Sequence, residues 1–522
     1  MRMIIKLLLW TLAIVLVLVA SGWLLADWLQ PRAVGVPSQA LPAQPDQTDL
    51  DRAVAPLLLQ HPGQSGAVLV NDGLTAFAVR AMTARSAGRS LDLQYYIWHD
   101  DITGRLLARE AWMAAERGVR VRLLLDDLST KGSDRKLLAL DAHPNIELRV
   151  YNPLRNRTGL FRIVEMVQRS FSLNHRMHNK AWIADGRVAV VGGRNVGVEY
   201  FDASHQANFH DLDAILVGPV VDQTSAIFDR FWNSEAVVPI QALVRKPPHT
   251  LDAMLRQVDA ETTSAEARRY LDRVFARFDA DAYFDGASDA GKGVHWSAAM
   301  QVLSDPPDKR GGQRDDWLMS QLQQQLASAN HSLQLISPYF VPGPTLTGHL
   351  TSLVAQGRRV GIITNSLAAN DVLAVHSGYR RYRTSLLQGG VTLHELRASR
   401  GGERDPSAFG SSGASLHTKA FLVDGQRGFI GSFNLDPRSA WLNTEMGLLF
   451  HDAGLGAELA AEFDHLARPQ LSYAVSIHAD GSLRWEDGST DPPTLLTDEP
   501  QATAGQRFTV AVLDWLPIES QL

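Results

Sequence analysis

The sequence contains no cysteine, so it has neither a disulfide framework nor a thiolate metal site. Lysine is scarce too: the 522 residues include eight, and arginine supplies most of the positive charge. The formal net charge is −6 and no long run of Lys or Arg occurs, which argues against a protein that follows nucleic acid by charge alone. A local basic pocket stays compatible with this composition.

The length and apolar content favour a globular body of more than one domain. A chain of 522 residues is too long for one simple core and suits two domains of ordinary size. Apolar residues make up 45% of it, which is enough for packed interiors.

One long uncharged stretch lies at the N-terminus, over residues 7–26. It matches the roughly 20 residues that cross a bilayer as a helix, and Trp10, Trp23 and Trp28 lie toward its ends. Because Arg2 and Lys6 precede the stretch, we expect an uncleaved transmembrane anchor over 1–30 with the body on the outer side. A cleaved signal peptide is the alternative. The stretch exceeds the roughly 7–15 apolar residues of such signals, and no clear cleavage site follows.

The remaining chain divides into a linker, two α/β lobes, a connection and a tail. Each lobe is expected to contain a strand–helix–strand unit with parallel pairing. In the first these are 90–98, 103–117 and 119–125, and in the second 332–336, 345–356 and 360–364. The predicted domains are a Pro-rich linker over 31–50, a first lobe over 51–238, a charged helical connection over 239–300, a second lobe over 301–470, and a C-terminal hairpin and tail over 471–522.

A repeated tract carries the strongest functional signal. His178-Asn-Lys180 and Asp185 recur as His417-Thr-Lys419 and Asp424, at one offset of 239 (417−178, 419−180 and 424−185). The same offset relates Gly192 to Gly431, Asn195 to Asn434 and Gly118 to Gly357. A constant offset over this span indicates an internal duplication, and two copies of a reactive motif suggest two facing half-sites.

The residue types in the motif suit a phosphate group. His and Lys two positions apart on a strand project to the same face, so each half-site is expected to offer an imidazole and an ammonium together. Lysine can neutralise non-bridging oxygens, while one imidazole attacks phosphorus and the other protonates the leaving oxygen. Two such histidines would titrate as a coupled pair. A set of two His, two Lys and two Asn needs no metal for this chemistry.

Other residues near each motif are expected to support it. Asp185 and Asp424 lie at predicted Asp-Gly turns, where we expect them to fix the loop rather than attack substrate. The glycine-rich tracts that end in Asn195 and Asn434 can bring N–H donors to an anion, and Ser432, opposite Gly193 of the first copy, adds a hydroxyl. A single lone histidine or tight turn would be an ordinary structural feature, but here both recur.

A nucleophilic imidazole needs an acceptor on its second nitrogen. Glu445 is the candidate for His417, and Asp211 or Asp213 for His178, since these carboxylates precede apolar runs after each motif. The first half carries extra residues after Asn195, so the choice between the two aspartates stays open.

The chain resembles the phospholipase D superfamily, whose signature is a pair of His-x-Lys-x4-Asp motifs, each followed by a glycine-rich Asn element. The tracts 95–101, 176–180, 191–195, 364–371, 376–379 and 431–439 make it most similar to the bacterial cardiolipin synthases of the C type. The likeness runs from about residue 51 to the C-terminus. It implies two similar α/β lobes related by a pseudo-twofold axis, with the active site between them.

The resemblance also implies the chemistry. Catalysis would proceed through a phosphohistidine intermediate without metal or other cofactor, with His178, Lys180, Asp185, His417, Lys419 and Asp424 as the catalytic set. His178 would be the nucleophile and His417 the general acid and then base. A phosphatidyl group would pass to phosphatidylglycerol, with phosphatidylethanolamine as a further candidate substrate. The expected location is the bacterial inner membrane, through a single-pass anchor and with the catalytic body on the periplasmic side.

Three alternatives stay open. The acceptor could be water, which would make a phospholipase producing phosphatidic acid, or another headgroup alcohol. The chain could be a phosphodiesterase acting on nucleic acid, which the anchor and the absence of basic runs make a poorer match. It could also be an inactive scaffold, although both motifs are intact. The sequence does not identify any protein partner.

Overall fold

The computed structural model describes residues 35–522 except 131, 158, 245–250, 278–292, 310–313 and 399–415, together with residues 6, 10, 11, 14, 17 and 21. Most of the stretch expected to cross a membrane thus lies outside the described residues. Within the part that is described, no helix is long and apolar enough to span a bilayer.

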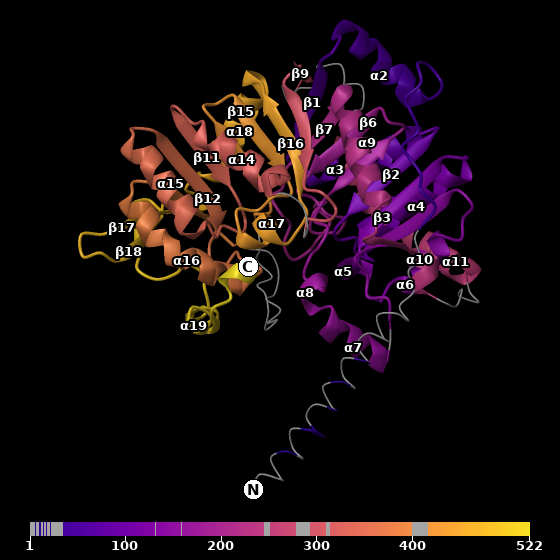
Figure 1. Cartoon of the computed structure of the whole chain (residues 1–522). Helices are drawn as coiled ribbons and strands as arrows, with labels where there is room; N and C mark the ends of the chain where they lie inside the picture. Colours follow the sequence, from indigo (N-terminus) through magenta and orange to yellow (C-terminus); the bar gives the residue numbers. More distant parts are fainter. Residues whose placement is uncertain are drawn as a thin grey trace.

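The first lobe is one large mixed sheet with its helices, drawn mostly in indigo, purple and magenta in Figure 1, and its last strand, β9, comes from the connection between the lobes. Its strand order is β8-β4-β3-β2-β5-β6-β7-β1-β9, in which β2, β3 and β4 are parallel to one another and the other neighbours are antiparallel. The strands are β1 (Ser65–Val70), β2 (Ser90–Tyr95), β3 (Arg120–Asp126), β4 (Ile146–Tyr151), β5 (Ala181–Ala184), β6 (Val188–Gly192), β7 (Asp213–Val217), β8 (Val237–Pro239) and β9 (His295–Ser297). The helices are α2 (Asp49–Gln60), α3 (Gly73–Ser86), α4 (Ile102–Glu116), α5 (Asp127–Thr130), α6 (Asp134–Leu140), α7 (Leu160–Gln168), α8 (Ser170–Leu173), α9 (Pro219–Trp232), α10 (Ile240–Leu243), α11 (Leu251–Thr262) and α12 (Ala265–Arg277).

The second half forms a sheet of the same kind, in orange and yellow in Figure 1. Its strand order is β10-β16-β15-β14-β11-β12-β13-β17-β18-β19, with β11, β12 and β13 parallel. The strands are β10 (Met300–Ser304), β11 (Ser332–Ile336), β12 (Arg359–Asn365), β13 (Thr392–Leu396), β14 (Ala420–Val423), β15 (Arg427–Gly431), β16 (Met446–His451), β17 (Ser472–Ile477), β18 (Leu483–Asp487) and β19 (Thr494–Leu496). The helices are α14 (Leu318–Ala327), α15 (Gly343–Ala355), α16 (Leu373–Gln388), α17 (Pro437–Trp441), α18 (Ala453–Leu466) and α19 (Ala504–Leu513), with short 3₁₀ turns at Arg314–Asp316 and Glu519–Gln521.

Eight strands of the first sheet match eight strands of the second in order. The order β8-β4-β3-β2-β5-β6-β7-β1 corresponds to β17-β13-β12-β11-β14-β15-β16-β10, so the internal duplication predicted from the 239-residue offset is a duplication of the whole fold. The strands predicted at 90–98, 119–125, 332–336 and 360–364 are present as β2, β3, β11 and β12, with parallel pairing in both lobes. The hairpin predicted near Asp480-Gly481 is present as β17–β18.

The lobes contact each other reciprocally. α9 of the first lobe packs on β10 of the second, and α18 of the second packs on β1 of the first. One buried apolar cluster contains residues of both sheets, including Leu69 and Ile183 together with Leu422 and Ile430. Contacts that repeat with the lobes exchanged are those that a twofold relation between similar units produces. The two lobes therefore share a continuous core.

Two connecting segments differ from expectation. Residues 35–47 contain no helix or strand, as predicted for a linker, but they lie bound to the first lobe: the N–H of Ser38 donates to Asn233 and that of Ala40 to Asp229. The connection predicted as helical over 239–300 contains α10, α11 and α12 but also β9, which completes the first sheet. Strand β9 has three residues, too few for a periodic pattern in the sequence to reveal it.

Candidate active site

Both copies of the repeated motif lie at the same edge of their sheets. His178 and Lys180 come directly before β5, which runs antiparallel to β2, so they lie at the carboxyl end of β2. His417 and Lys419 hold the same place before β14. The prediction that each His and Lys share a strand was thus wrong in detail, because the strands begin one residue after each lysine. The pairs are nevertheless brought to one edge, where the lobes meet.

Backbone hydrogen bonds cross between the lobes at this edge. The N–H of His178 donates to the carbonyl of Thr444 at 2.9 Å, and the N–H of His417 donates to the carbonyl of His210 at 2.7 Å. Isolated bridges join Met177 to Thr444 and Leu416 to His210. Each motif is thus held in place by the opposite lobe.

The acceptors of the two imidazoles also cross between lobes. Nδ1 of His178 lies 2.7 Å from Oε2 of Glu445, and Nδ1 of His417 lies 2.6 Å from Oδ2 of Asp211. The pairing expected within each half was wrong, since Glu445 serves the first histidine and Asp211 the second. The carboxylates are fully buried and the histidines nearly so. With Nδ1 engaged, Nε2 is the nitrogen left to react.

Strand registers show why Asp211 and not Asp213 is the partner. Gly192 pairs with Asp213 in the first sheet, and Gly431 pairs with Gly447 in the second. Asp211 lies two residues before Asp213, and Glu445 lies two residues before Gly447. The two carboxylates therefore hold equivalent positions in the two lobes. Asp213 instead accepts from Arg80 at 2.9 Å, as a buried ion pair. It stabilises the first lobe and does not contact either histidine.

The motif lysines are buried and held by their own motifs. Lys180 donates to the carbonyl of His178 at 2.6 Å, and Lys419 donates to that of His417. Each side chain is about 1% exposed. Burial lowers the pKa of Lys180 to about 7 and that of Lys419 to about 8, because an ammonium in a dry site loses hydration.

The pKa values of the two motif histidines are lowered as well. Burial, opposed by Glu445 and reinforced by the two lysines, lowers the pKa of His178 to about 4. The pKa of His417 lies well below its usual value for the same reasons, with His178 adding to the repulsion. Burial would raise the pKa of Glu445, but its hydrogen bonds with His178 and Ser432 and the nearby Lys180 hold that pKa below its usual value. The free site therefore holds neutral imidazoles beside two buried lysines, which can pair with an incoming anion.

Asp185 and Asp424 lie at hairpin turns away from the imidazoles. Both have positive φ (53°) and precede a glycine with positive φ, as expected for the Asp-Gly turns. The carboxylate of Asp185 accepts from the N–H groups of residues 88, 89 and 90, and that of Asp424 from residues 330, 331 and 332. Each ties its β-hairpin to the start of the neighbouring strand. These contacts agree with the expected loop-fixing role.

The residues of the Gly-rich elements have different surroundings in the two lobes. Asn195 accepts from the N–H of Ile97 and donates to the hydroxyl of Tyr200 at 3.0 Å. Asn434 is buried, and its side-chain oxygen has no hydrogen-bond partner among the described residues. The side-chain carbonyl of Asn434 is thus available to a ligand. The side chain of Asn195, by contrast, binds the backbone just after β2.

The difference between Gly193 and Ser432 follows the difference between their carboxylates. The hydroxyl of Ser432 donates to Glu445 and so orients it. A Cβ at Gly193 would lie 2.2 Å from the Oδ1 atom of Asp211. Asp211 is shorter than Glu445, so its carboxylate lies close to the backbone and position 193 must be a glycine. The first lobe therefore lacks the hydroxyl of Ser432 because its carboxylate is an aspartate, and not because a phosphate contact was lost.

Aromatic rings pack on the histidines and were not predicted as site residues. Tyr96 makes an edge contact with His178 at 4.8 Å between centroids. Tyr200 and Phe209 enclose His417 at 5.1 and 5.2 Å. Tyr96 lies in the family-like tract 95–101, which could have revealed it, whereas nothing in the sequence marks Phe209. The rings exclude water and hold the imidazole planes.

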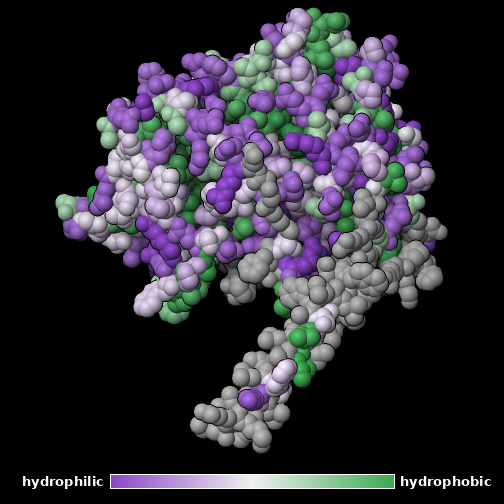
Figure 2. Space-filling model, viewed as in Figure 1, coloured by the Kyte–Doolittle hydropathy of each residue, from purple (hydrophilic) through white to green (hydrophobic). Residues whose placement is uncertain are grey.

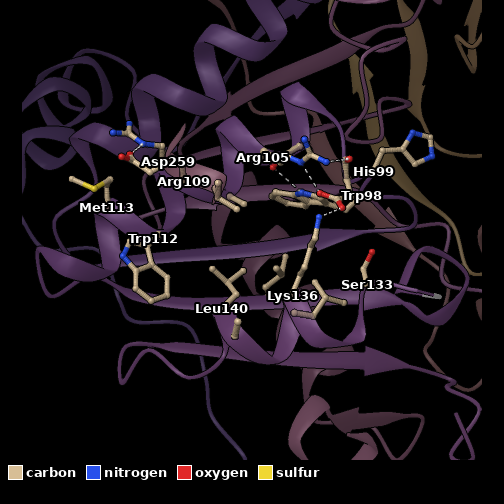
Figure 3. Close-up of a pocket in the computed structure, with 17 residues that line it drawn as sticks. Trp98, His99, Arg105, Arg109, Trp112, Met113, Ser133, Lys136, Leu140 and Asp259 are labelled. Atoms are coloured by element: carbon tan, nitrogen blue, oxygen red, sulfur yellow. Dashed lines mark hydrogen bonds and ion pairs between the residues drawn. The ribbon is translucent and has the colours of Figure 1, made fainter. Parts of the chain in front are cut away.

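Two neighbouring features lie outside this set. Within the described residues, one His-and-carboxylate group has metal-like spacing: His99, Asp101 and Glu199. There Asp101 already accepts from Gly104, Thr103 and Val198, and the hydrogen bond to Glu199 raises the pKa of His99, so the group is an ion-pair cluster. Beyond it, α4, α6 and α11 enclose a mainly apolar cavity of about 280 Å³ around Trp98, Trp112 and Leu140 (Figure 3).

Comparison with known proteins identifies the family. A family model described as cardiolipin synthase, PLD-like domain, matches residues 82–232 and 322–467, one match in each lobe. The chain belongs to the phospholipase D superfamily. Among relatives of this phospholipase D-type enzyme, cardiolipin synthase C of Escherichia coli (strain K12) is 39% identical over 477 residues, covering 90% of this chain and 99% of the relative.

More distant relatives agree. An uncharacterized protein of Helicobacter pylori (strain ATCC 700392 / 26695) is 30% identical, over 85% of this chain and 87% of that one. The crystal structure of phosphatidylserine synthase from Haemophilus influenzae Rd KW20 is 15% identical, with a TM-score of 0.53 over 82% of this chain and 92% of that chain, and thus has the same fold. This chain is accordingly a phospholipase D-type enzyme similar to the cardiolipin synthases.

Proposed function

We propose that the protein is a membrane-anchored phosphatidyltransferase that forms cardiolipin by moving a phosphatidyl group onto phosphatidylglycerol. The observation that supports this most is the crossed pair of hydrogen bonds, His178 to Glu445 and His417 to Asp211, beside two buried lysines. The similarity to cardiolipin synthase C over nearly its whole length supports the substrate class. By this proposal the body works at the outer face of the bacterial inner membrane.

In the first step Nε2 of His178 attacks the phosphorus of the donor lipid. The bond from phosphorus to the headgroup oxygen breaks, and His417 donates a proton to that leaving oxygen. Lys180 and Lys419 neutralise the non-bridging oxygens as charge develops. Glu445 accepts a hydrogen bond from the Nδ1–H group of His178 and stabilises the cationic ring of the phosphohistidine.

In the second step the hydroxyl of phosphatidylglycerol gives its proton to His417 and attacks phosphorus. The bond between phosphorus and His178 breaks, which releases cardiolipin and restores both imidazoles. The low pKa of His417 in the free enzyme is compatible with its acid role, because a bound phosphate anion favours the protonated ring. No step requires a metal or another cofactor.

The test uses the full chain in liposomes of labelled phosphatidylglycerol, with and without phosphatidylethanolamine, and lipid products resolved by mass spectrometry. Cardiolipin made by the wild type but not by His178→Ala is the expected result. Its formation only when phosphatidylethanolamine is present would identify that lipid as the donor. Phosphatidic acid as the sole product would show a hydrolase, and unimpaired turnover by His178→Ala would refute the two-histidine mechanism.

A further inference from the structure

Helix α7 has its polarity reversed for a surface helix in water. Its acidic residue, Glu165, is 1% exposed, whereas Ile163 and Val167 are 59% and 67% exposed. Val164 and Met166 are exposed as well. Surface helices normally turn charged residues outward and apolar ones toward the core. An exposed apolar face of this kind is typical of a surface that binds an apolar partner.

The C-terminal tail, residues 504–522, shows the same reversal. Phe508 and Trp515 are 71% and 89% exposed, and Val512 and Leu516 are exposed beside them. The tail is firmly attached to α16, because Asp514 binds Ser377 at 2.6 Å and Arg380 at 3.1 Å. The apolar side chains are thus presented outward by a fixed backbone. At the lower left of the body in Figure 2, where Figure 1 places α19, apolar residues are visible at the surface.

The two elements lie on either side of the segment that leads to His178. Asn174 follows α8 directly, and its amide donates to the side chain of Gln521 at 2.7 Å. Arg438 donates to Asn174 and also, through its N–H, to the carbonyl of Leu522. Both elements lie on the lower side of the molecule in Figure 1, with α5, α8 and the C-terminus.

The distribution of exposed apolar residues is uneven. Of eighteen large apolar side chains exposed in the part of the chain that the structure describes, four are on α7 and four are in the tail. Leu128, just after β3, and Val372, which follows β12, are exposed too. Carboxyl ends of parallel strands meet at one edge of a sheet, so these residues accumulate on the side that carries the histidines.

The charges on both elements fit an anionic surface. The acidic residues of α7 and the tail are all paired: Glu165 with Arg169, Asp514 with Arg380 and Glu519 with Arg381. The same two elements also contain Arg162, on α7, and Arg507, on α19, which are not used in these three ion pairs. Exposed apolar side chains beside basic residues are the composition that binds the headgroup region of anionic bilayers.

We propose that α7 and the C-terminal tail form a membrane-docking surface, which rests on an anionic bilayer with segment 174–178 between its two parts. The lipid phosphodiester then reaches His178 from the bilayer without leaving it. Trp515 lies at the headgroup level, where the amphipathic indole ring is favoured. This inference rests on the proposed function, since a lipid substrate is what makes the bilayer the partner.

The absence of cysteine makes a direct test possible. Single-cysteine variants Val167→Cys and Trp515→Cys of the full chain are labelled with a fluorophore that shifts to shorter wavelength in an apolar medium. Leu59→Cys is the matched control, because Leu59 is 83% exposed on α2, at the opposite side of the molecule in Figure 1. Each protein is reconstituted into vesicles of phosphatidylglycerol and phosphatidylethanolamine, or of phosphatidylcholine alone.

We expect the labels at positions 167 and 515 to show blue-shifted emission, and brominated acyl chains to quench it. The blue shift should be largest in the anionic vesicles. Position 59 should show water-like emission throughout, even where the N-terminal segment holds the protein at the membrane. Water-like emission at both 167 and 515 would overturn the proposal. This readout does not depend on turnover, so a failure of the proposed reaction remains distinguishable.

Activity provides a second readout. Val167→Glu and Trp515→Glu together should lower turnover of phosphatidylglycerol in vesicles at least tenfold. Turnover of a short-chain phosphatidylglycerol dissolved as monomers should be unchanged, because neither residue contacts the histidines. Equal loss on both substrates would show that the two positions act on the site itself and not on docking. Leu59→Glu should match the wild type on both.

Discussion

At the scale of single residues, the site depends on which carboxylate faces which imidazole. Sequence spacing placed Glu445 near His417, because the two are close along the chain. The structure pairs Glu445 with His178 instead, 267 residues away. Spacing predicts contacts within one lobe, but it carries no information on how two equivalent lobes face each other. The residue types needed for the chemistry were therefore predictable, and their partners were not.

Lysine illustrates the same limit. Scarcity of lysine helped to identify Lys180 and Lys419, but Lys309 is buried as completely. It binds Asp305 and the carbonyls of Ser439 and Asn443, and so holds the loop that leads to Glu445. Recurrence in both copies, and not rarity alone, separates the lysines of the site from a structural one.

Glu445→Gln tests the crossed acceptor. The amide can still accept from Nδ1 of His178 but carries no charge to stabilise the cationic ring, so kcat should fall about 10²- to 10⁴-fold. Asp211→Asn should lower it similarly through His417. Asp213→Asn is the control, because Asp213 pairs with Arg80 and should affect the melting temperature more than kcat. Near-normal kcat in Glu445→Gln would show that the carboxylate only packs.

The shifted pKa values predict the pH profile of kcat/KM. His178 is protonated and unreactive below about pH 4, and Lys180 loses its positive charge above about pH 7. Phosphate binding favours the ammonium, so kcat/KM should fall on both sides of this window, and inhibition by inorganic phosphate should weaken above pH 7. In Lys180→Arg the guanidinium stays charged at alkaline pH. The fall of kcat/KM should therefore shift to a higher pH, even though the kcat of this variant is lower. An alkaline limb near pH 10 in the wild type would contradict the buried ammonium.

At the scale of elements, local patterns predicted the strands and turns well. β2, β3, β11 and β12 and both Asp-Gly turns are where alternation and turn residues indicated them. Short or exposed elements such as β9 and α7 were missed. Strand β9 has too few residues to show a period, and α7 carries its apolar residues outward. The rule that relates hydrophobic pattern to the core does not apply to a helix whose apolar residues point away from the core.

The turn carboxylates provide a test at this scale. Asp185→Asn should lower the free energy of unfolding by about 1–3 kcal/mol, because one amide oxygen cannot satisfy three N–H donors as well as a carboxylate does. Asp185→Ala should cost more, since alanine is unfavourable at the positive φ of this position. Activity should be partly retained in the folded asparagine variant.

The other lobe gives the comparison. Asp424 accepts from the corresponding three N–H groups and also pairs with Arg427. Its side chain is 14% exposed, however, and two of its donors lie at the surface, so Asp424→Asn should be milder than Asp185→Asn. Chemical denaturation and initial rates measured on the same preparations check both effects. Complete loss of turnover in a stably folded Asp185→Asn protein would assign that carboxylate a direct role in the reaction.

At the scale of the whole molecule, duplication explains the arrangement of the site. A constant offset of 239 residues predicted two similar lobes, and the matching strand orders of the two sheets agree with it. The crossed contacts between lobes are a consequence of twofold packing and appear only when the lobes are assembled. Each half-site borrows its carboxylate and a backbone acceptor from the other lobe. Neither lobe alone can therefore hold its histidine in the reactive arrangement.

The same assembly buries two ammonium groups, and this affects stability. The pKa of Lys180 is lowered from 10.5 to about 7 in the folded chain. Between pH 7 and 10 the unfolded chain therefore binds more protons, so wild-type stability should rise with pH through this window. Lys180→Met has no such group, and it should be inactive yet more stable than the wild type by a few kcal/mol at pH 7. The difference in melting temperature should shrink toward pH 10, when the wild-type amine is neutral in the folded state.

Inorganic phosphate provides the control for this prediction. It should raise the melting temperature of the wild type at pH 7, because the anion offsets the buried charge of Lys180 and Lys419, and it should have a smaller effect on Lys180→Met, which keeps only Lys419. Lys136→Met, which removes an exposed lysine paired with Asp100, should show neither the gain in stability nor the reduction in the phosphate effect. A Lys180→Met protein that is less stable than the wild type at every pH would mean that the lysine contributes more through its hydrogen bond than it costs by burial.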